Sequence, residues 1–493
     1  MLPIAIASVA LLVRIADAQI SAGGSTQPMS QFGDTASTGT ERVQAYTYGI
    51  DAGVGETDNV TLAPTDKISQ TIATVDADFT VNQRSRLFDV NATGNFSDLN
   101  YLQHAYGNEF LGRLDGVADA AIVPGHLVWV FRDDFGQAAL DQYTPVTPNN
   151  IEDVNYLSTG PDLKLRFGGI NFVNISARYA RAQYQTSPFN SNRLLASIAV
   201  GRDVSAGGSI SLNANTERVM FDNTALNSDF ERSSGFGRYE IHGARTDLVG
   251  ELGGTVVSQS GASTDVLPTN VPLGTNGAPL IVSSQTGGPG SLSGPLAKLE
   301  LDRKISPSAK LIFTAGRDLT DASSSFSNQT TGVTSINSVS PAASTSDNYR
   351  MTYATAGWQY KLNRTTLAVT ARWEKDIYPA LSTLDVTDYG AGFNVERKLT
   401  RHFTAQLLGN WYKSDYPHAA LPSQVIGSTD YANSILGASL TWRHGRALEV
   451  RFRCDHDSYT VSNGNTGYHE TRAFLTVGYR PMSNPATEEL PER

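Results

Sequence analysis

The sequence predicts an all-β fold: a transmembrane antiparallel β-barrel of about 20 strands, within a range of about 18 to 22, with short periplasmic turns and long extracellular loops. Three observations lead to this prediction. From residue 42 onward, segments of about 10 to 14 residues alternate in polarity. The connections between these segments alternate between short and long, and several tryptophans lie near segment ends.

The chain begins with a segment that is typical of secretion signals. Residues 2–13 are apolar, and Ala16-Asp17-Ala18 has the form of a signal-peptidase site. No basic residue precedes the apolar run and Arg14 interrupts it, which leaves the true start codon open. We expect a signal peptide at 1–18, a flexible periplasmic lead-in at 19–41, an outer-membrane barrel at 42–480 and a C-terminal tail at 481–493.

The composition excludes several classes of protein. A net charge of -10 with 17% charged residues is unlike a basic nucleic-acid-binding protein, so no nucleic-acid partner is expected. Cys454 is the single cysteine of the sequence, which excludes an internal disulfide and a cysteine-rich metal site. After residue 18 no apolar run of about 18 residues occurs. A membrane would therefore be crossed by a closed barrel.

The segment from Leu448 to Asp457 shows the alternation of polarity clearly. Apolar residues and cysteine occupy its even positions up to 454, and charged residues occupy its odd positions. Because adjacent side chains of a strand point to opposite faces, one face of such a segment is apolar and the other is charged. The charged face would line the lumen, where the charges could set the selectivity of a pore or only brace the wall as ion pairs. The predicted lumen charges are Lys298, Glu300, Asp302, Arg372, Glu374, Glu396, Glu449, Arg451, Arg453 and Asp455.

The connections alternate in length, and we call this alternation their parity. It favours a membrane barrel over the alternative folds, a soluble β-sandwich or a propeller. Short connections alternate with longer ones that are rich in Pro, Asn and Ser, including the stretches 260–293 and 323–346. Such a pattern is typical of periplasmic turns and extracellular loops, and an even number of strands puts both ends of the barrel on the short-turn side. The predicted short turns are 82–86, 167–171, 203–208, 243–247, 306–308, 362–365, 399–402 and 443–446.

The aromatic residues indicate two girdles at the membrane interfaces. Trp358 and Trp442 lie on apolar faces just before short turns, whereas Trp373 and Trp411 lie near the long-loop ends. The tyrosines that we assign to the same girdles are Tyr360, Tyr412 and Tyr479.

The sequence contains no signature of an enzyme. A phosphate-binding glycine loop, paired histidines at helical spacing and a Gly-x-Ser-x-Gly elbow are all absent. His456 lies between Asp455 and Asp457, but neighbours on a strand face opposite sides, so His456 should face lipid and the two aspartates the lumen. We therefore predict no catalytic residue, no metal site and no cofactor.

The stretch YGIDAGVGETDNVTLAP, residues 48–64, resembles the opening of the outer-membrane β-barrel proteins associated with PEP-CTERM/exosortase exopolysaccharide systems. Those proteins begin with a signal peptide, a spacer, a strand ending in Gly-x-Gly, and a Thr-Asp-Asn turn. The matching residues are Gly53, Gly55, Thr57, Asp58, Asn59 and Val60, and we call the first five the family-marker residues. In the predicted barrel Asp58 and Asn59 lie in the first extracellular turn, where their side chains bond back to their own backbone, and a weak cation contact is the alternative.

The resemblance implies where the protein is located and in which kind of bacterium it occurs, but it implies no reaction. It implies the outer membrane of a Gram-negative bacterium that makes exopolysaccharide, and it supplies no catalytic residues. One departure is that many outer-membrane barrels end on an aromatic residue of the last strand, whereas here a tail follows Tyr479.

We therefore expect a structural or transport barrel linked to exopolysaccharide export. The alternatives are a general or substrate-selective diffusion porin and an outer-membrane barrel enzyme, a hydrolase. The expected partners are outer-membrane lipid, lipopolysaccharide and components of polysaccharide export, and the oligomeric state stays open.

Overall fold

A computed structural model describes residues 43–140, 145–224, 226–260, 291–328, 345–417, 430–445, 447–461 and 467–481 of the chain. The predicted signal peptide, the lead-in and the tail from residue 482 lie outside these residues. The strands are β1 (Val43–Thr57), β2 (Gln70–Arg84), β3 (Phe88–Tyr101), β4 (Glu109–Val123), β5 (Leu127–Ala139), β6 (Ile151–Phe167), β7 (Asn171–Tyr184), β8 (Ser191–Ser205), β9 (Gly208–Phe221), β10 (Asp229–His242), β11 (Thr246–Ser260), β12 (Ser291–Ser306), β13 (Ala309–Asp321), β14 (Asn348–Leu362), β15 (Thr365–Ile377), β16 (Val386–Lys398), β17 (Phe403–Asp415), β18 (Tyr431–His444), β19 (Leu448–Val461) and β20 (Tyr468–Tyr479).

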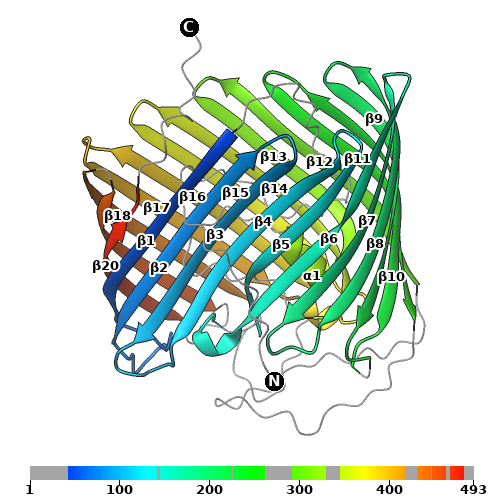
Figure 1. Ribbon diagram of the computed structural model, residues 1–493. Helices are drawn as coiled ribbons and strands as arrows, with labels where there is room; N and C mark the ends of the chain where they lie inside the picture. Colours follow the sequence, from blue (N-terminus) through cyan, green and yellow to red (C-terminus); the bar gives the residue numbers. More distant parts are fainter. Residues whose placement is uncertain are drawn as a thin grey trace.

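These 20 strands form one closed antiparallel barrel (Figure 1). Each strand pairs with its neighbours in the chain, and β20 returns to pair with β1. The predicted fold class and strand count are confirmed, and the soluble sandwich and propeller are excluded. The helical elements of the described residues are short: α1 (Ala322–Asn328) and two 3-10 turns, η1 (Pro148–Asn150) and η2 (Ser382–Leu384). No helix in this part of the chain is long and apolar enough to cross a membrane.

The connections follow the predicted parity. Those after even-numbered strands hold between two residues, as at 206–207, and four residues, as at 399–402, while the others hold six residues or more, as at 185–190. The prediction omitted one short turn, 124–126 between β4 and β5. That turn is tight, with Gly125 in the left-handed region at φ 80°, and the strands around it alternate in polarity less regularly than the rest.

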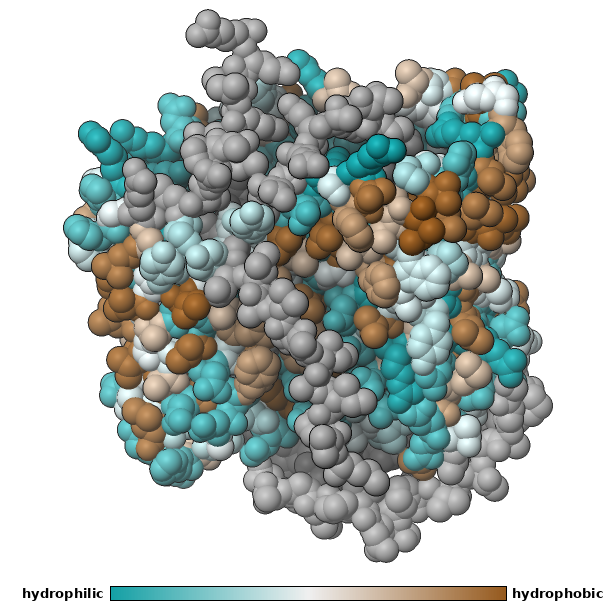
Figure 2. Space-filling model, in the orientation of Figure 1, coloured by the Kyte–Doolittle hydropathy of each residue, from teal (hydrophilic) through white to brown (hydrophobic). Residues whose placement is uncertain are grey.

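The two faces of the wall have opposite character. Large apolar side chains on the outer face are exposed, among them Leu212 and Leu252 at 74% each, while charged side chains such as Glu449 and Asp455 are buried on the inner face. On the left flank of Figure 2, apolar residues lie between hydrophilic residues at the upper and lower ends. Exposed apolar side chains of this kind are stable only in lipid, so the barrel is an outer-membrane protein.

The barrel closes where β1 pairs with β20, and we call this pairing the seam. The seam is shorter than the pairing of β1 with β2. It has eight residue pairs, from Ile50 opposite Tyr479 to Thr57 opposite Arg472, whereas β1 and β2 form 15 pairs. The first seven residues of β1, 43–49, therefore extend past the last seam pair.

Arg480 directly follows β20 and stabilises the short-turn end of this seam. Its guanidinium contacts the carboxylates of Asp51 on β1 and Asp78 on β2, the latter at 2.7 Å, and lies 3.7 Å from Glu449 on β19. Burial alone would lower the pKa of Arg480, but Asp78 and Asp51 raise it above its ordinary value, so the side chain stays charged. One cation thus joins three strands around the seam.

Replacing Arg480 by alanine is expected to destabilise the barrel by about 3 kcal/mol, because it leaves buried carboxylates without their cation. The measurement is the urea midpoint of unfolding in lipid vesicles. The control is Arg84→Ala, which removes a pair with Asp89 whose arginine side chain is 49% exposed, and it should shift stability by less than about 1 kcal/mol. Equal midpoints for the two variants would contradict this role of Arg480.

Candidate functional site

The predicted lumen charges lie on the inner face of the wall, mostly as close ion pairs. Several of these pairs join a residue to the one two positions along the same strand: Lys298 with Glu300 at 2.7 Å, Arg372 with Glu374 at 2.8 Å, and Arg453 with Asp455 at 2.7 Å. Asp302 instead pairs with Lys310 on β13 at 2.7 Å, and Glu449 accepts from Arg443 and Arg451 at 2.8 and 2.7 Å. Glu396 lies on β16 opposite Thr366 and Gln406. Most of these contacts are local braces that neutralise charge within the wall.

His456 and its two flanking aspartates lie on opposite faces of β19. Asp455 and Asp457 are buried, whereas His456 is exposed and its Nδ1 lies 3.1 Å from Thr471 Oγ1. The three side chains do not converge. Among the described residues, no group of three or more His, Cys, Asp or Glu side chains could hold a metal ion.

The predicted girdle residues lie on the outer face with one exception. Trp358, Trp442, Trp411 and Tyr479 are exposed by 36, 37, 43 and 53% respectively, and Trp373 is half-buried on the same face of β15 as the exposed Val369. The assignment of Tyr412 is wrong, because it directly follows the outward Trp411 and so faces the lumen, where its hydroxyl lies 3.3 Å from Asn433 Nδ2. The prediction also missed Trp129 on β5, which is 37% exposed.

The hairpin of β13 and β14 leaves the wall at its extracellular end. The pairing of β12 with β13 stops at Ala297 opposite Arg317, but β13 continues to pair with β14 as far as Asp321 opposite Asn348. Leu319 lies over the inner side of β12, since a Cβ added at Gly294 would come within 3.5 Å of its side chain. The last residues of β13 therefore enter the lumen.

Helix α1 continues this inward path. Its residues Ala322, Ser323, Ser324, Ser325 and Ser327 are between 3 and 7% exposed. The hydroxyl of Ser323 lies 2.9 Å from that of Tyr184 on β7, and that of Ser325 lies 2.6 Å from that of Tyr349 on β14. Phe326 packs on a buried apolar cluster that includes Val154, Tyr156, Ala180 and Phe230. A segment that belongs to an extracellular connection is thus packed inside the barrel.

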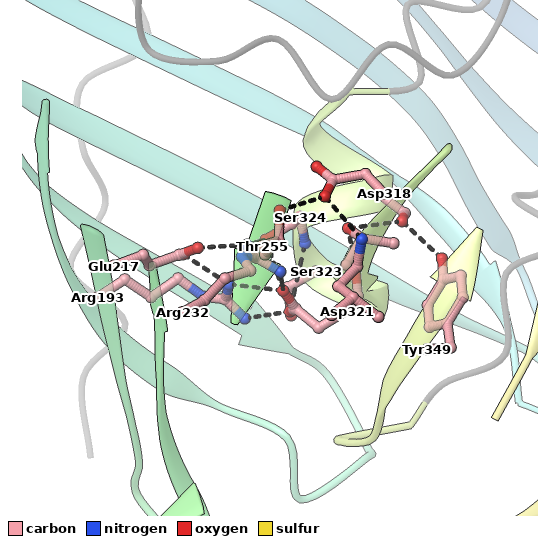
Figure 3. Close-up of polar contacts among 12 residues, drawn as sticks. Arg193, Glu217, Arg232, Thr255, Asp318, Asp321, Ser323, Ser324 and Tyr349 are labelled. Carbon is pink, nitrogen blue, oxygen red and sulfur yellow. Dashed lines mark hydrogen bonds and ion pairs between the residues drawn. The ribbon is translucent and has the colours of Figure 1, made fainter. Parts of the chain in front are cut away.

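Four charged side chains hold this segment against the wall (Figure 3). Arg193 on β8 binds Asp321 at 2.6 Å and Glu217 on β9 at 3.0 Å. Arg232 on β10 binds Asp321 at 3.0 Å and also contacts Glu217. Ser324 of α1 accepts from both arginines, at 3.0 and 2.8 Å, and donates to Asp321 at 2.6 Å. We call Arg193, Glu217, Arg232 and Asp321 the docking cluster.

The docking cluster is deeply buried and electrically balanced. Arg193 is fully buried and Asp321 is 2% exposed. Two guanidinium groups face two carboxylates, so the four side chains together carry no net charge. Arg193 also lies 5.8 Å above the ring of Tyr156, a distance at which the ring face attracts a cation. Sequence reasoning missed this cluster, because Arg193 and Asp321 are 128 positions apart and follow no shared pattern.

The family-marker residues all lie at the extracellular half of the seam. Gly53 and Gly55 belong to β1, and a Cβ at either would come within 2.5 Å of Thr476 or 2.2 Å of Phe474 on β20. Thr57 ends β1 and donates to Glu470 at 2.5 Å. The two glycines therefore make room for side chains of the closing strand.

Asp58 and Asn59 both bind across the seam, and Asn59 also binds locally. Asp58 accepts from the backbone N–H of Thr471 at 2.8 Å. Asn59 is fully buried, and its amide donates to the carbonyl oxygens of His469 at 3.1 Å and Ala63 at 2.7 Å. The expected bond back to the local backbone is present at Asn59, whereas the hydrogen bonds described for Asp58 join it to Thr471. The sequence did not indicate the contacts with β20, which lies about 410 positions away.

Comparison with known proteins gives only distant likenesses. No known protein family and no curated protein matches the chain. Among solved structures, the copper transporter OprC is 11% identical over 89% of this chain and 82% of its own, with a TM-score of 0.43. The FrpB iron transporter from Neisseria meningitidis is 9% identical over 88 and 81%, with a TM-score of 0.40. The ferric enterobactin receptor PfeA from Pseudomonas aeruginosa is 9% identical over 90 and 80%, with a TM-score of 0.44.

Replacing Asn59 by alanine is expected to free the first extracellular loop from β20, because three hydrogen bonds of a buried amide are lost. The loop contains Lys67, whose ammonium donates to the carbonyl oxygen of His469 at 2.8 Å. Trypsin added to intact outer membranes should cleave after Lys67 several times faster in the variant. The matched control is Thr65→Ala, an exposed position in the same loop, and equal cleavage of both variants would refute the prediction.

Proposed function

We propose that this protein is an outer-membrane transport barrel in which α1 acts as a movable gate, and that it serves a system that exports exopolysaccharide. The observation that carries the gating part of this proposal is the docking cluster. It holds a segment from an extracellular connection inside the lumen, where a passing solute would meet it.

The docking cluster differs from the other lumen ion pairs in the strands that it connects. Most of those pairs join positions on one strand or on neighbouring strands, so they brace the wall itself. Asp321 at the end of β13 instead reaches β8 and β10, which are not neighbours of β13 in the sheet. The cluster therefore fixes an inserted element to the wall and contributes little to the pairing of strands.

The ion pairs of the docking cluster are suited to holding α1 either docked or displaced. A buried ion pair contributes little net stability when it is intact, but the loss of one partner leaves a buried charge and is strongly destabilising. The docked state of α1 thus depends on all four side chains being present. Displacement of α1 would expose both arginines to lumen water, which lowers the cost of separating the charges.

The link to exopolysaccharide export rests on the resemblance of the family-marker residues. Deleting the gene is expected to reduce the polysaccharide released by the bacterium. It is also expected to reduce the display of the PEP-CTERM proteins that such systems sort to the cell surface. The measurements are the hexose content of the culture supernatant and surface labelling, with a plasmid copy of the gene as the control. Unchanged secretion and display would remove this part of the proposal and leave the gating part standing.

The diffusion porin is the second candidate, favoured by the inner face of mixed charge in a barrel wide enough to hold water. The two candidates differ in the behaviour of the wild type. A porin without a gate gives large, steady conductance steps in planar bilayers, whereas a docked α1 gives small or rare steps. We propose no catalytic role.

Replacing Asp321 by asparagine is expected to raise single-channel conductance or open probability several-fold. Loss of the carboxylate leaves Arg193 and Arg232 with Glu217 alone, which weakens docking of α1 by about 3 kcal/mol. The measurement is planar-bilayer recording of the purified protein. The control is Asp302→Asn, which breaks an inward ion pair with Lys310 away from α1. Identical recordings for wild type and Asp321→Asn would exclude α1 as a gate.

A further inference from the structure

The inner wall at the extracellular end carries a row of ring and amide side chains across four adjacent strands. Tyr412 of β17 lies opposite Asn433 of β18, Asn433 opposite Tyr459 of β19, and Tyr459 opposite Tyr468 of β20. Tyr431 lies two positions nearer the extracellular connection on β18. We call these five residues the tyrosine row.

The rings of the tyrosine row fix one another in place. Tyr459 and Tyr468 stack with centroids 5.2 Å apart and planes 9° from parallel, and Tyr431 and Tyr459 stack at 5.1 Å. Tyr412 meets Tyr431 edge to face at 5.9 Å. These separations fall in the range that aromatic pairs prefer. Tyr459 and Tyr468 are buried while Tyr412 and Tyr431 are half-buried, so the row offers a rigid and partly accessible aromatic surface.

Hydrogen-bonding groups accompany the rings. Two positions farther from the extracellular end than Tyr459 and Tyr468, Asp457 of β19 lies opposite Glu470 of β20. The hydroxyl of Tyr468 donates to the carboxylate of Asp457 at 3.4 Å. Asn433 is 6% exposed, yet its Oδ1 accepts no hydrogen bond within the described part of the barrel. Because a buried acceptor without a donor is unfavourable, this oxygen is available for a donor from a ligand.

The charges beside the row select against an anion. Asp457 and Glu470 are both acidic, and Arg472, which lies 3.7 Å from Glu470, balances one of these two negative charges. A ligand that carries carboxylates would meet like charge, whereas hydroxyl groups can donate to these oxygens.

We infer that the tyrosine row binds an uncharged saccharide chain. A sugar ring presents an apolar C–H face that packs on tyrosine rings, and its hydroxyls donate to Asn433, Asp457 and Glu470. This inference deepens the proposed function and rests on it, since it names the class of solute that enters the lumen from the extracellular end.

The test is isothermal titration calorimetry on the purified full-length barrel in detergent. The probes are cellohexaose and maltohexaose, which are uncharged, and hexagalacturonate, which is anionic. We expect at least one uncharged hexasaccharide to bind the wild type more tightly than hexagalacturonate. The double variant Tyr412→Leu with Tyr431→Leu is expected to bind it about tenfold more weakly. The single variant Tyr412→Phe keeps the ring and should retain most of the affinity.

The matched control is Tyr389→Leu on β16. Tyr389 lies opposite Lys413, the residue after Tyr412, but it points outward and is 39% exposed, so this variant should bind like the wild type. The inference is overturned if neither uncharged probe binds, if hexagalacturonate binds more tightly, or if the double variant and the control bind alike. Mobility of unheated samples on gels reports folding. If the double variant does not fold, the single variant Tyr412→Leu takes its place, and it is expected to bind the uncharged probe several-fold more weakly than Tyr412→Phe.

Calorimetry needs no open passage, which separates this inference from the proposed gate. Saccharide binding with unchanged conductance of Asp321→Asn would remove the gate and leave the binding site. Changed conductance of Asp321→Asn without any saccharide binding would remove the binding site and leave the gate.

Discussion

Closure of the sheet is the constraint on which the rest of this structure depends. A strand edge in lipid would leave backbone groups without partners, so β1 has to meet β20. The seam is short, with eight residue pairs, and side chains reinforce both of its ends. Arg480 contacts the carboxylates of three strands at the short-turn end, and Asp58 and Asn59 bind the backbone of β20 at the other. The family-marker residues thus have a physical role in fitting the first strand to the last.

Closure also creates an inner face that borders the lumen and does not pack against a second sheet. Charges on this face are tolerable beside lumen water or next to opposite charges, and pairs such as Arg372 with Glu374 neutralise one another along a single strand. The docking cluster differs from these pairs because its members come from strands that are not all neighbours. Its ion pairs stabilise an insertion into the lumen, and this insertion is the internal element that we propose as a gate.

Sequence reasoning predicted the features that depend on local pattern. The period of two along each strand gave the inward and outward faces, and the lengths of the connections gave the strand count. The error at Tyr412 was avoidable, since two adjacent residues cannot both face lipid. The inward path of β13 and α1 could not be predicted, because it depends on Asp321 finding Arg193 and Arg232 far along the chain. The contacts of Asn59 were hidden for the same reason, since a local turn motif does not show which distant strand it meets.

The order of the strands places the two interior features on opposite arcs of the wall. The docking cluster uses β8, β9 and β10 together with the end of β13, while the tyrosine row uses β17 to β20. Strands β1 to β7 separate the row from β8 on one side, and β14 to β16 separate it from β13 on the other. A ligand on the row therefore need not replace any contact of the docking cluster.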